Sequence, residues 1–208
     1  MATAPYDVKR ELRALYGPRN RDWQTLVVPP QRFLAVDGSG DPNTAPAYVE
    51  AVEALYAVAY SVKFASKRGQ GRDLVVGPLE GLWYADDASV FTARDKAAWS
   101  WTMLISLPDW VGDADVDDAI AAARAKKKAL PGLDLVRIER LDEGLCLQLL
   151  HVGSYDEETP ALARLHGEVL PAGGLRERGR HHEVYLSDPR RTAPEKLKTV
   201  VRQPVSPA

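Results

Sequence analysis

The sequence has only one cysteine, and this shortage excludes a disulfide-stabilised fold. Cys146 is the single cysteine among 208 residues, so no disulfide can form within the chain. Its neighbours Leu145 and Leu147 favour a buried structural thiol over a nucleophile. A chain without disulfides is typical of a reducing compartment, and we therefore expect a cytoplasmic protein.

Long apolar runs and a surplus of charge are lacking as well. Nowhere do about eighteen apolar residues follow one another, and residues 1–10 show no secretory pattern, so we expect neither a membrane span nor export. The formal net charge is −2, whereas nucleic-acid-binding domains usually carry a basic surplus. The one lysine run, residues 126–128, is typical of a solvated helix end. We expect no direct nucleic-acid binding.

Common catalytic and nucleotide motifs are also missing. The chain has no Gly-x-Ser-x-Gly, and the segment Gly69-Gln70-Gly71 opens neither a Walker motif nor a dinucleotide fingerprint. His181 and His182 are adjacent, and adjacent strand residues point to opposite faces, so they cannot share one metal ion without a bulge. We expect neither a metal nor a cofactor.

The composition that remains is that of an ordinary globular protein, with 45% hydrophobic and 27% charged residues. Helical spacing of apolar residues predicts a short N-terminal helix at 6–16, a long helix at 47–67, and further helices at 113–129 and 159–170. Alternation of apolar and polar residues, together with short apolar runs, predicts an interrupted strand at 26–36. The same signals predict strands at 74–84, 99–107, 135–141, 145–152, 182–186 and 198–203.

A short repeat indicates an internal duplication. Gly38-Ser39-Gly40-Asp41 and Gly153-Ser154-Tyr155-Asp156 share Gly-Ser-x-Asp, and each follows a strand and precedes a helix. We predict an α+β fold, one domain over 1–208, built of two β-α-β-β modules at about 22–112 and 113–204. Their antiparallel sheet should carry helices on one face and a concave ligand cleft between the halves. By pseudo-symmetry, Glu80 and Glu183 should both approach that cleft.

Aromatic residues accompany these two glutamates on the predicted strands. Aromatic walls stack on planar ligands and attract cations. A carboxylate among them would have its pKa raised by desolvation, and could neutralise a cationic ligand or act as a general acid or base. The alternative is that the tryptophans form core and that the glutamates face solvent or pair with an arginine such as Arg180 or Arg190.

Four stretches of the chain resemble the GyrI-like small-molecule-binding family in its standalone form. The resemblance runs from Tyr6 to Val205, and its most specific part is the stretch His-His-Glu-x-Tyr-Leu-Ser-Asp-Pro-Arg at residues 181–190. The stretches are Pro78-Leu79-Glu80-Gly81-Leu82-Trp83, His151-Val152-Gly153-Ser154-Tyr155-Asp156-Glu157-Glu158, His181-His182-Glu183-Val184-Tyr185-Leu186-Ser187-Asp188-Pro189-Arg190 and Glu195-Lys196-Leu197-Lys198-Thr199.

The resemblance implies site residues. Glu183 matches the family's buried glutamate, and Tyr155 is the next position carried over. Both are catalytic candidates if the protein is an enzyme. His151 is a ligand-binding candidate for which a structural role is the alternative. The expected pocket lining is Glu80, Trp83, Trp101, Trp110 and Tyr185.

Three functions follow from this resemblance and stay open. The first is capture of a lipophilic aromatic or cationic compound, as in the effector domains of multidrug regulators, for drug or toxin sensing or resistance. The second is hydrolysis of the cyclopropane ring of DNA-alkylating natural products in the same pocket. The third is binding to a protein partner such as gyrase. The chain has no helix-turn-helix segment and should not read DNA by itself.

Overall fold

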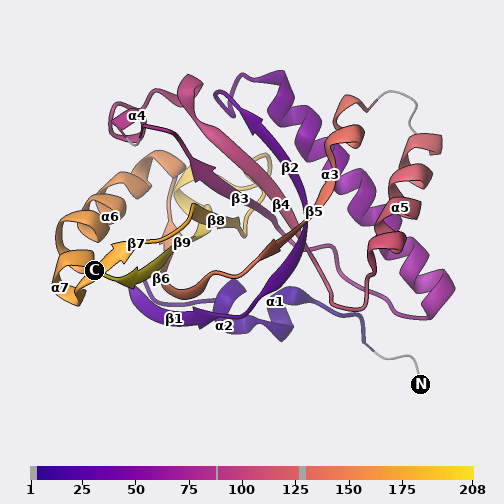
Figure 1. Cartoon of the computed structure of the whole chain (residues 1–208), viewed down its shortest axis with the longest axis horizontal. Helices are drawn as coiled ribbons and strands as arrows, with labels where there is room; N and C mark the ends of the chain where they lie inside the picture. The colour runs from indigo at the N-terminus through magenta and orange to yellow at the C-terminus, as the bar shows by residue number, and fades with distance from the viewer. Residues whose placement is uncertain (1–3, 88, 127–129) are drawn as a thin grey trace.

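One antiparallel sheet organises the chain. The computed structural model describes residues 4–87, 89–126 and 130–208, and Figure 1 shows their arrangement. The nine-stranded sheet has the order β1-β6-β9-β8-β3-β4-β2-β5, with β7 paired to β9. The strands are β1 Gln24–Val28, β2 Gln31–Ser39, β3 Leu79–Tyr84, β4 Ser100–Leu107, β5 Arg137–Leu141, β6 Gly144–Val152, β7 Leu175–Glu177, β8 His181–Tyr185 and β9 Lys198–Pro207.

The strand order is symmetric about the central pair of β8 and β3, because the fold is duplicated. Strand β9 corresponds to β4, β6 to β2, and β1 to β5. One module runs β2-α3-β3-β4 and the other runs β6, a helical stretch, β8 and β9, and the two modules meet where β3 pairs with β8. The predicted α+β fold with duplicated β-α-β-β modules is therefore confirmed. Strand β1 pairs with β6 and strand β5 with β2, so each module also receives an edge strand from the other side of the duplication. The module boundaries at 22–112 and 113–204 stay a prediction.

Helices cover the two ends of one sheet face, which we call the front face. Helices α3 (Pro46–Ala65) and α5 (Asp113–Lys126) pack together over the β2 and β4 end. Helix α6 (Thr159–Arg164), the π-turn η5 (Leu165–Val169) and α7 (Leu170–Gly173) cover the β6 and β9 end. Figure 1 shows α6 and α7 at one end of the sheet and α3 and α5 at the other. Between the two helical layers, no helix covers the front face of the central strands β3 and β8 in the described part of the chain.

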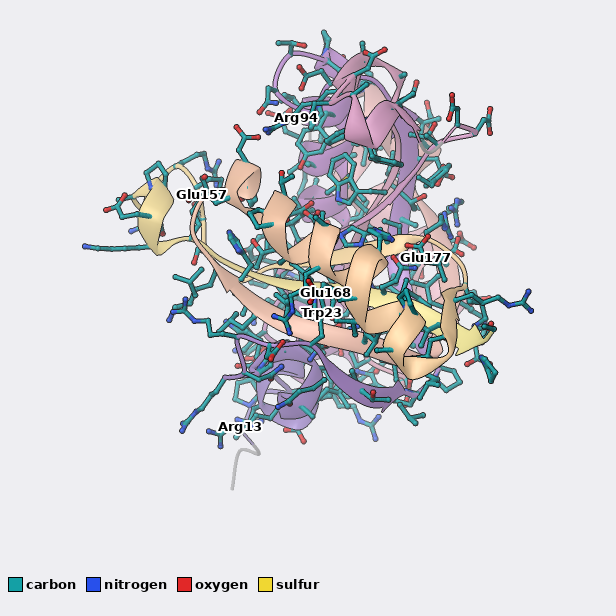
Figure 2. The ribbon with its side chains drawn as sticks, turned by 90° about the vertical axis from the view of Figure 1, so that its left-hand side faces the viewer. Arg13, Trp23, Arg94, Glu157, Glu168 and Glu177 are labelled. Carbon is teal, nitrogen blue, oxygen red and sulfur yellow. The ribbon has the colours of Figure 1, made fainter. Side chains whose placement is uncertain are left out.

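The α6 to α7 layer is fixed to the sheet by an apolar core. Leu165 and Leu170 pack against Leu147 and Val201 of the sheet. Trp23, just before β1, donates its indole N–H to the Ala161 carbonyl at 3.1 Å. Figure 2 shows this layer in front of the sheet, with Glu168 and Trp23 labelled on it and beside it.

The opposite face, the back face, is covered by two short N-terminal helices. The predicted helix at 6–16 is interrupted at Leu12, whose φ of −112° and ψ of 51° separate α1 (Val8–Glu11) from α2 (Arg13–Tyr16). Val8, Leu15 and Tyr16 pack on Val28, Val184, Val200 and Cys146, which is free and buried.

A buried polar chain crosses the back face. The Tyr16 hydroxyl donates to Glu80 at 2.9 Å, and the second Glu80 oxygen lies 3.0 Å from His182 Nε2. His182 Nδ1 lies 3.0 Å from Glu143, whose other oxygen accepts from Arg202 Nη1 at 3.0 Å. Two carboxyl groups thus alternate with two basic side chains, and the network ties β8 and β9 to α2.

Several element boundaries differ from those predicted. The interrupted strand at 26–36 is two strands with different partners, β1 and β2, divided at Pro29-Pro30. The strand predicted at 74–84 begins only at Leu79, after Pro78. Strand β7 was not predicted at all. Helix α5 ends at Lys126, and residues 127–129, which include most of the lysine run, lie outside the described residues.

The remaining short helical turns connect these elements. They are η1 Ser66–Gln70, α4 Ser89–Thr92, η2 Lys96–Ala98, η3 Pro131–Leu135, η4 Tyr155–Glu158 and η6 Pro194–Lys196. Across the described ranges, no helix has both the length and the apolar character that crossing a membrane requires.

Candidate functional site

A wide cleft lies on the front face between the two helical layers. Helix α3 supplies Tyr48 and Tyr56 to one wall, and η4 supplies Tyr155 and Glu158 to the other. Its floor comes from β3 and β8, with Leu79, Trp83, His181, Glu183 and Tyr185. The cleft has a volume of about 1790 Å³, more than the ~300–1,000 Å³ of a typical small-molecule site. It therefore has room for a bulky aromatic ligand.

Alternation along β8 puts Glu183 into this cleft. His181, Glu183 and Tyr185 line the front face, while His182 and Val184 are fully buried on the back face. The two adjacent imidazoles therefore do point to opposite faces. Across the strand pair, Glu183 lies opposite Gly81, where a Cβ would come within 3.0 Å of both Trp83 Nε1 and Tyr185 Oη. The absence of a side chain at Gly81 thus leaves room for the 2.9 Å hydrogen bond from Trp83 to the Tyr185 hydroxyl.

The Glu183 carboxyl is partly buried and has no basic partner of fixed charge. Its side chain is 14% exposed, and His181 Nε2 lies 3.4 Å from Oε1. Among the residues that the structure describes, no lysine or arginine lies within ion-pair distance of it. A carboxylate held in an aromatic cleft in this way can accept a cation or a proton from a bound molecule.

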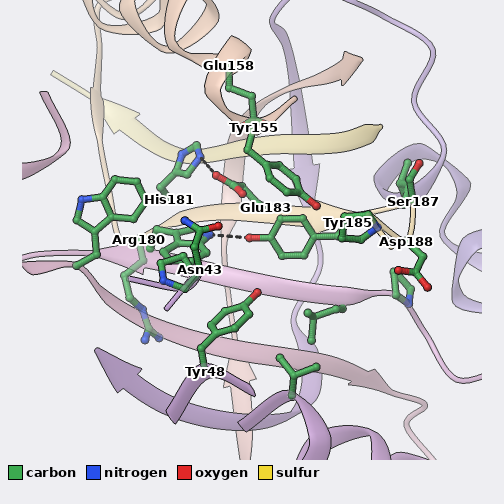
Figure 3. Close-up of a pocket in the computed structure, with 18 of the residues that line it drawn as sticks. Asn43, Tyr48, Tyr155, Glu158, Arg180, His181, Glu183, Tyr185, Ser187 and Asp188 are labelled. Carbon is green, nitrogen blue, oxygen red and sulfur yellow. Dashed lines mark hydrogen bonds and ion pairs between the residues drawn. The ribbon is translucent and has the colours of Figure 1, made fainter. Parts of the chain in front are cut away.

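Three tyrosines surround Glu183. In Figure 3, Tyr48 and Tyr155 extend from opposite walls toward Tyr185, which lies on the floor. The rings of Tyr155 and Tyr185 meet edge to face at 5.7 Å. Burial first, and then the Glu183 carboxylate, raise the pKa of Tyr155 to about 12 and that of Tyr185 well above its usual value. These hydroxyls therefore stay protonated and can donate hydrogen bonds to a ligand.

Glu158 is a second acid of the cleft and was missed in the sequence. A capping box, in which Ser154 and Glu157 exchange hydrogen bonds, starts η4 and places Tyr155 and Glu158 three residues apart in the turn. Both line the cleft. The repeated Gly-Ser-x-Asp marked this turn, but nothing local indicated which of its acids would be buried. Tyr48 was also missed, because a tyrosine on an amphipathic helix is equally typical of core packing.

Four basic side chains at the edge of the cleft are paired with acids. Arg94 and Lys96 both contact Asp156, and Arg190 lies 3.0 Å from Asp188. Arg180 lies 3.5 Å from Glu139. The charges of these four cations are therefore offset by those acids.

A comparison of the sequence with known protein families agrees with this fold and this cleft. The model of the GyrI-like small-molecule-binding domain matches residues 24–206. The chain belongs to the GyrI-like family. No curated protein sequence is similar enough to count as a relative.

Several solved structures are similar to this chain. An uncharacterized conserved protein from Listeria innocua is 40% identical over 97% of this chain and 100% of that one, with a TM-score of 0.88. A hydrolase from Listeria innocua is 40% identical with the same coverage and a TM-score of 0.83. The C-terminal domain of EcmrR is 10% identical over 90% of this chain and 98% of that one, with a TM-score of 0.58, and shares the fold.

Not every residue carried over from the GyrI-like resemblance reaches the cleft. Glu183, Tyr155, Tyr185 and Trp83 line it. Glu80 does not, because the β3 to β8 register pairs it with Val184 and so turns it to the back face, where it is fully buried against Tyr16 and His182. The expectation that both glutamates approach the cleft is therefore corrected.

Two tryptophans and His151 also lie outside the described lining of the cleft. Trp101 is fully buried beneath α3 and lies across Gly38, where a Cβ would be 2.1 Å from its ring. Trp110 packs edge to face on Tyr6 at 5.1 Å, and its indole donates to Ser66. His151 Nε2 lies 2.9 Å from the Ser154 carbonyl, a contact that supports the turn before Tyr155. Core packing explains the tryptophans, and the structural alternative explains His151.

Proposed function

We propose that this GyrI-like protein captures lipophilic aromatic compounds in the front-face cleft and prefers those that carry a positive charge. The observation that carries the proposal is the position of Glu183, an acid without a lysine or arginine partner among the described residues, on the floor of an aromatic cleft. A cation entering there gains an attraction that it cannot obtain from fully hydrated surface acids. Tyr48, Tyr155, Tyr185 and Trp83 supply rings for stacking and for cation–π contact.

The biological role that fits this proposal is sensing of, or resistance to, a toxic aromatic compound. Such a role suits a cytoplasmic protein, as the single unpaired cysteine suggests. It requires no contact with nucleic acid, and the proposal includes none.

Charge preference is tested by replacing Glu183 with glutamine, which keeps the size and removes the charge. We expect the affinity for N-methylacridinium, a planar permanent cation, to fall about tenfold or more, or about 1.4 kcal/mol. The affinity for N-methylacridone, a neutral molecule of similar shape, should change less than about threefold, since RT ln 3 is only ~0.6 kcal/mol. Both affinities follow from titration of dye fluorescence.

A matched control for this variant is Glu168→Gln. Glu168 is exposed on the α6 to α7 layer, outside the cleft, and its replacement changes the net charge by the same amount. It should leave both affinities unchanged. Equal loss of the cation in both variants would mean that the protein's total charge, and not the cleft, attracts it.

A second candidate function is hydrolysis in the same cleft. It is favoured by the Tyr155 hydroxyl, whose pKa is raised first by burial and then by the nearby Glu183 carboxylate, and by the similar protein from Listeria innocua described as a hydrolase. In an activated cyclopropane, Glu183 would take a proton from water while the water oxygen bonds to a ring carbon. The ring C–C bond breaks, its electron pair moves to the conjugated carbonyl oxygen, and Tyr155 donates a hydrogen bond there. The proton on Glu183 then returns to that oxygen.

Ring opening is tested by incubating the protein with a cyclopropane-bearing alkylator and following the hydrated product by mass spectrometry. Turnover should fall about 10²-fold in Glu183→Gln and in Tyr155→Phe, as is typical when a general base or an oxyanion donor is lost. Glu168→Gln should keep the parental rate. Retention of one unchanged molecule per protein, without product, would leave capture as the function and exclude hydrolysis.

A further inference from the structure

Glu158 is the most deeply buried acid of the cleft. Its side chain is 3% exposed, and its Oε1 is buried without a hydrogen-bond partner among the described residues. It nevertheless lines the cleft, where a ligand could reach it. A buried carboxyl oxygen without a partner costs free energy, and an ionised one costs more. The Glu158 carboxyl must therefore either carry a proton or gain a partner from a bound ligand.

The groups packed around Glu158 supply no positive charge to neutralise it. Strand β8 presents the Glu183 carboxylate, with His181 Nε2 3.4 Å from it, and η4 itself presents the Tyr155 hydroxyl. Strand β9 presents the uncharged Thr199, which lowers the pKa of Glu158 by less than burial and Glu183 raise it. Figure 3 labels Glu158 and Tyr155, both on η4, above Glu183 on β8. Arg94 and Lys96, the basic residues of the adjacent edge, contact Asp156 instead. Burial first, and repulsion by Glu183 second, raise the pKa of Glu158 well above its usual value.

We propose that Glu158 is a specificity-determining second acid of the cleft, which carries a proton in the empty protein and releases it when an organic cation binds. The inference rests on the proposed capture function and extends it to the chemical class of the ligand. Glu158 holds the proton, because burial and the neighbouring Glu183 carboxylate both favour its neutral form. Binding a monocation then converts a site with one negative charge into one with two.

The sign of the effect follows from linkage. A cation near both carboxyl groups offsets their mutual repulsion and lowers the pKa of Glu158, so the proton leaves as the ligand enters. By reciprocity, removing the proton strengthens cation binding. Affinity should therefore rise with pH, by up to about tenfold per pH unit for one linked proton, and level off once Glu158 is ionised in the empty protein. A neutral ligand lowers no pKa and should show no such slope.

The experiment is isothermal calorimetry of N-methylacridinium and of N-methylacridone in pairs of buffers with different ionisation enthalpies, between about pH 6 and 9. For the cation, the apparent enthalpy should depend on the buffer, with up to one proton released per ligand bound. For N-methylacridone it should not. Cation binding without proton release at every pH would overturn the inference and leave the capture function intact.

Variants assign the proton to its residue. Glu158→Gln should still bind the cation through Glu183, but with no proton release and an affinity that no longer depends on pH. Glu168→Gln should release the proton as the parent does. If Glu158→Gln still released as many protons as the parent on binding the cation, the assignment to Glu158 would be overturned. Failure of the parent protein to bind either dye would remove the capture function, and this inference with it.

Discussion

Replacing Glu143 with glutamine is expected to lower the free energy of unfolding by about 3–5 kcal/mol, the usual cost of breaking a buried ion pair from one side. Glu143 is 6% exposed and bridges His182 and Arg202, with both distances at 3.0 Å. Arg202 Nη1 lies only 3.4 Å from His182 Nδ1. Without the carboxylate, two basic groups would face each other in a fully buried site. Urea unfolding at about pH 6, where an unperturbed histidine is largely charged, measures the loss.

The control for this prediction is an exposed ion pair. Glu168 lies 3.6 Å from Arg164 at the protein surface, and Glu168→Gln should change the free energy of unfolding by less than about 1 kcal/mol. A loss below about 1 kcal/mol for Glu143→Gln as well would show that water or a rearranged side chain replaces the carboxylate, and that the network contributes little.

The back-face network also bears on the cleft, because one strand serves both faces. On β8, His182 belongs to the buried network and the next residue, Glu183, to the cleft. Glu80, opposite Val184 on the neighbouring strand, holds His182 from one side, and Glu143 holds it from the other. These contacts fix the pleat of β8, and thereby the direction in which Glu183 points.

The sequence predicted those features that depend on local periodicity. Alternation along 99–107 and at His181-His182 gave β4, β8 and the opposite directions of the two histidines. The recurrence of Gly-Ser-x-Asp indicated the duplication, and both copies do lie between a strand and a helical segment. These signals succeed because a side-chain period is a property of the strand itself.

Glu80 shows why the site was only partly predictable. The repeat aligned Glu80 with Glu183, but the strands pair with Glu80 opposite Val184 and Gly81 opposite Glu183. A shift of one residue turns a side chain to the other face, and no local signal fixes the register between two strands so far apart in sequence. The prediction that Trp101 and Trp110 line the pocket failed for another reason. An aromatic residue on a sheet or loop is apolar enough to lie either in the core or in a pocket. Glu158 and Tyr48 face the cleft only through the packing of η4 and α3 against the sheet.

Raising the pH from about 6.5 to 9 is expected to destabilise the protein by about 3 kcal/mol through His182 alone. Burial by itself lowers the pKa of His182, but the Glu143 carboxylate and hydrogen bonds to Glu143 and Glu80 raise it from 6.5 to about 9. Both ring nitrogens face carboxyl oxygens, so the imidazolium can donate to both. A group whose folded pKa is raised stabilises the fold fully below its unfolded pKa. That contribution is lost as the pH rises through the folded value.

Urea unfolding at a series of pH values measures this loss, and His182→Gln should remove most of the slope between about pH 6.5 and 9. If that variant does not fold, the parent protein still gives the answer through the NMR titration of its four histidines. One imidazole should titrate near pH 9, far from the ~6.5 of an unperturbed histidine. Titration of all four near the unperturbed value would mean that His182 is neutral in the fold, and that the two carboxyl groups beside it share their charge in another way.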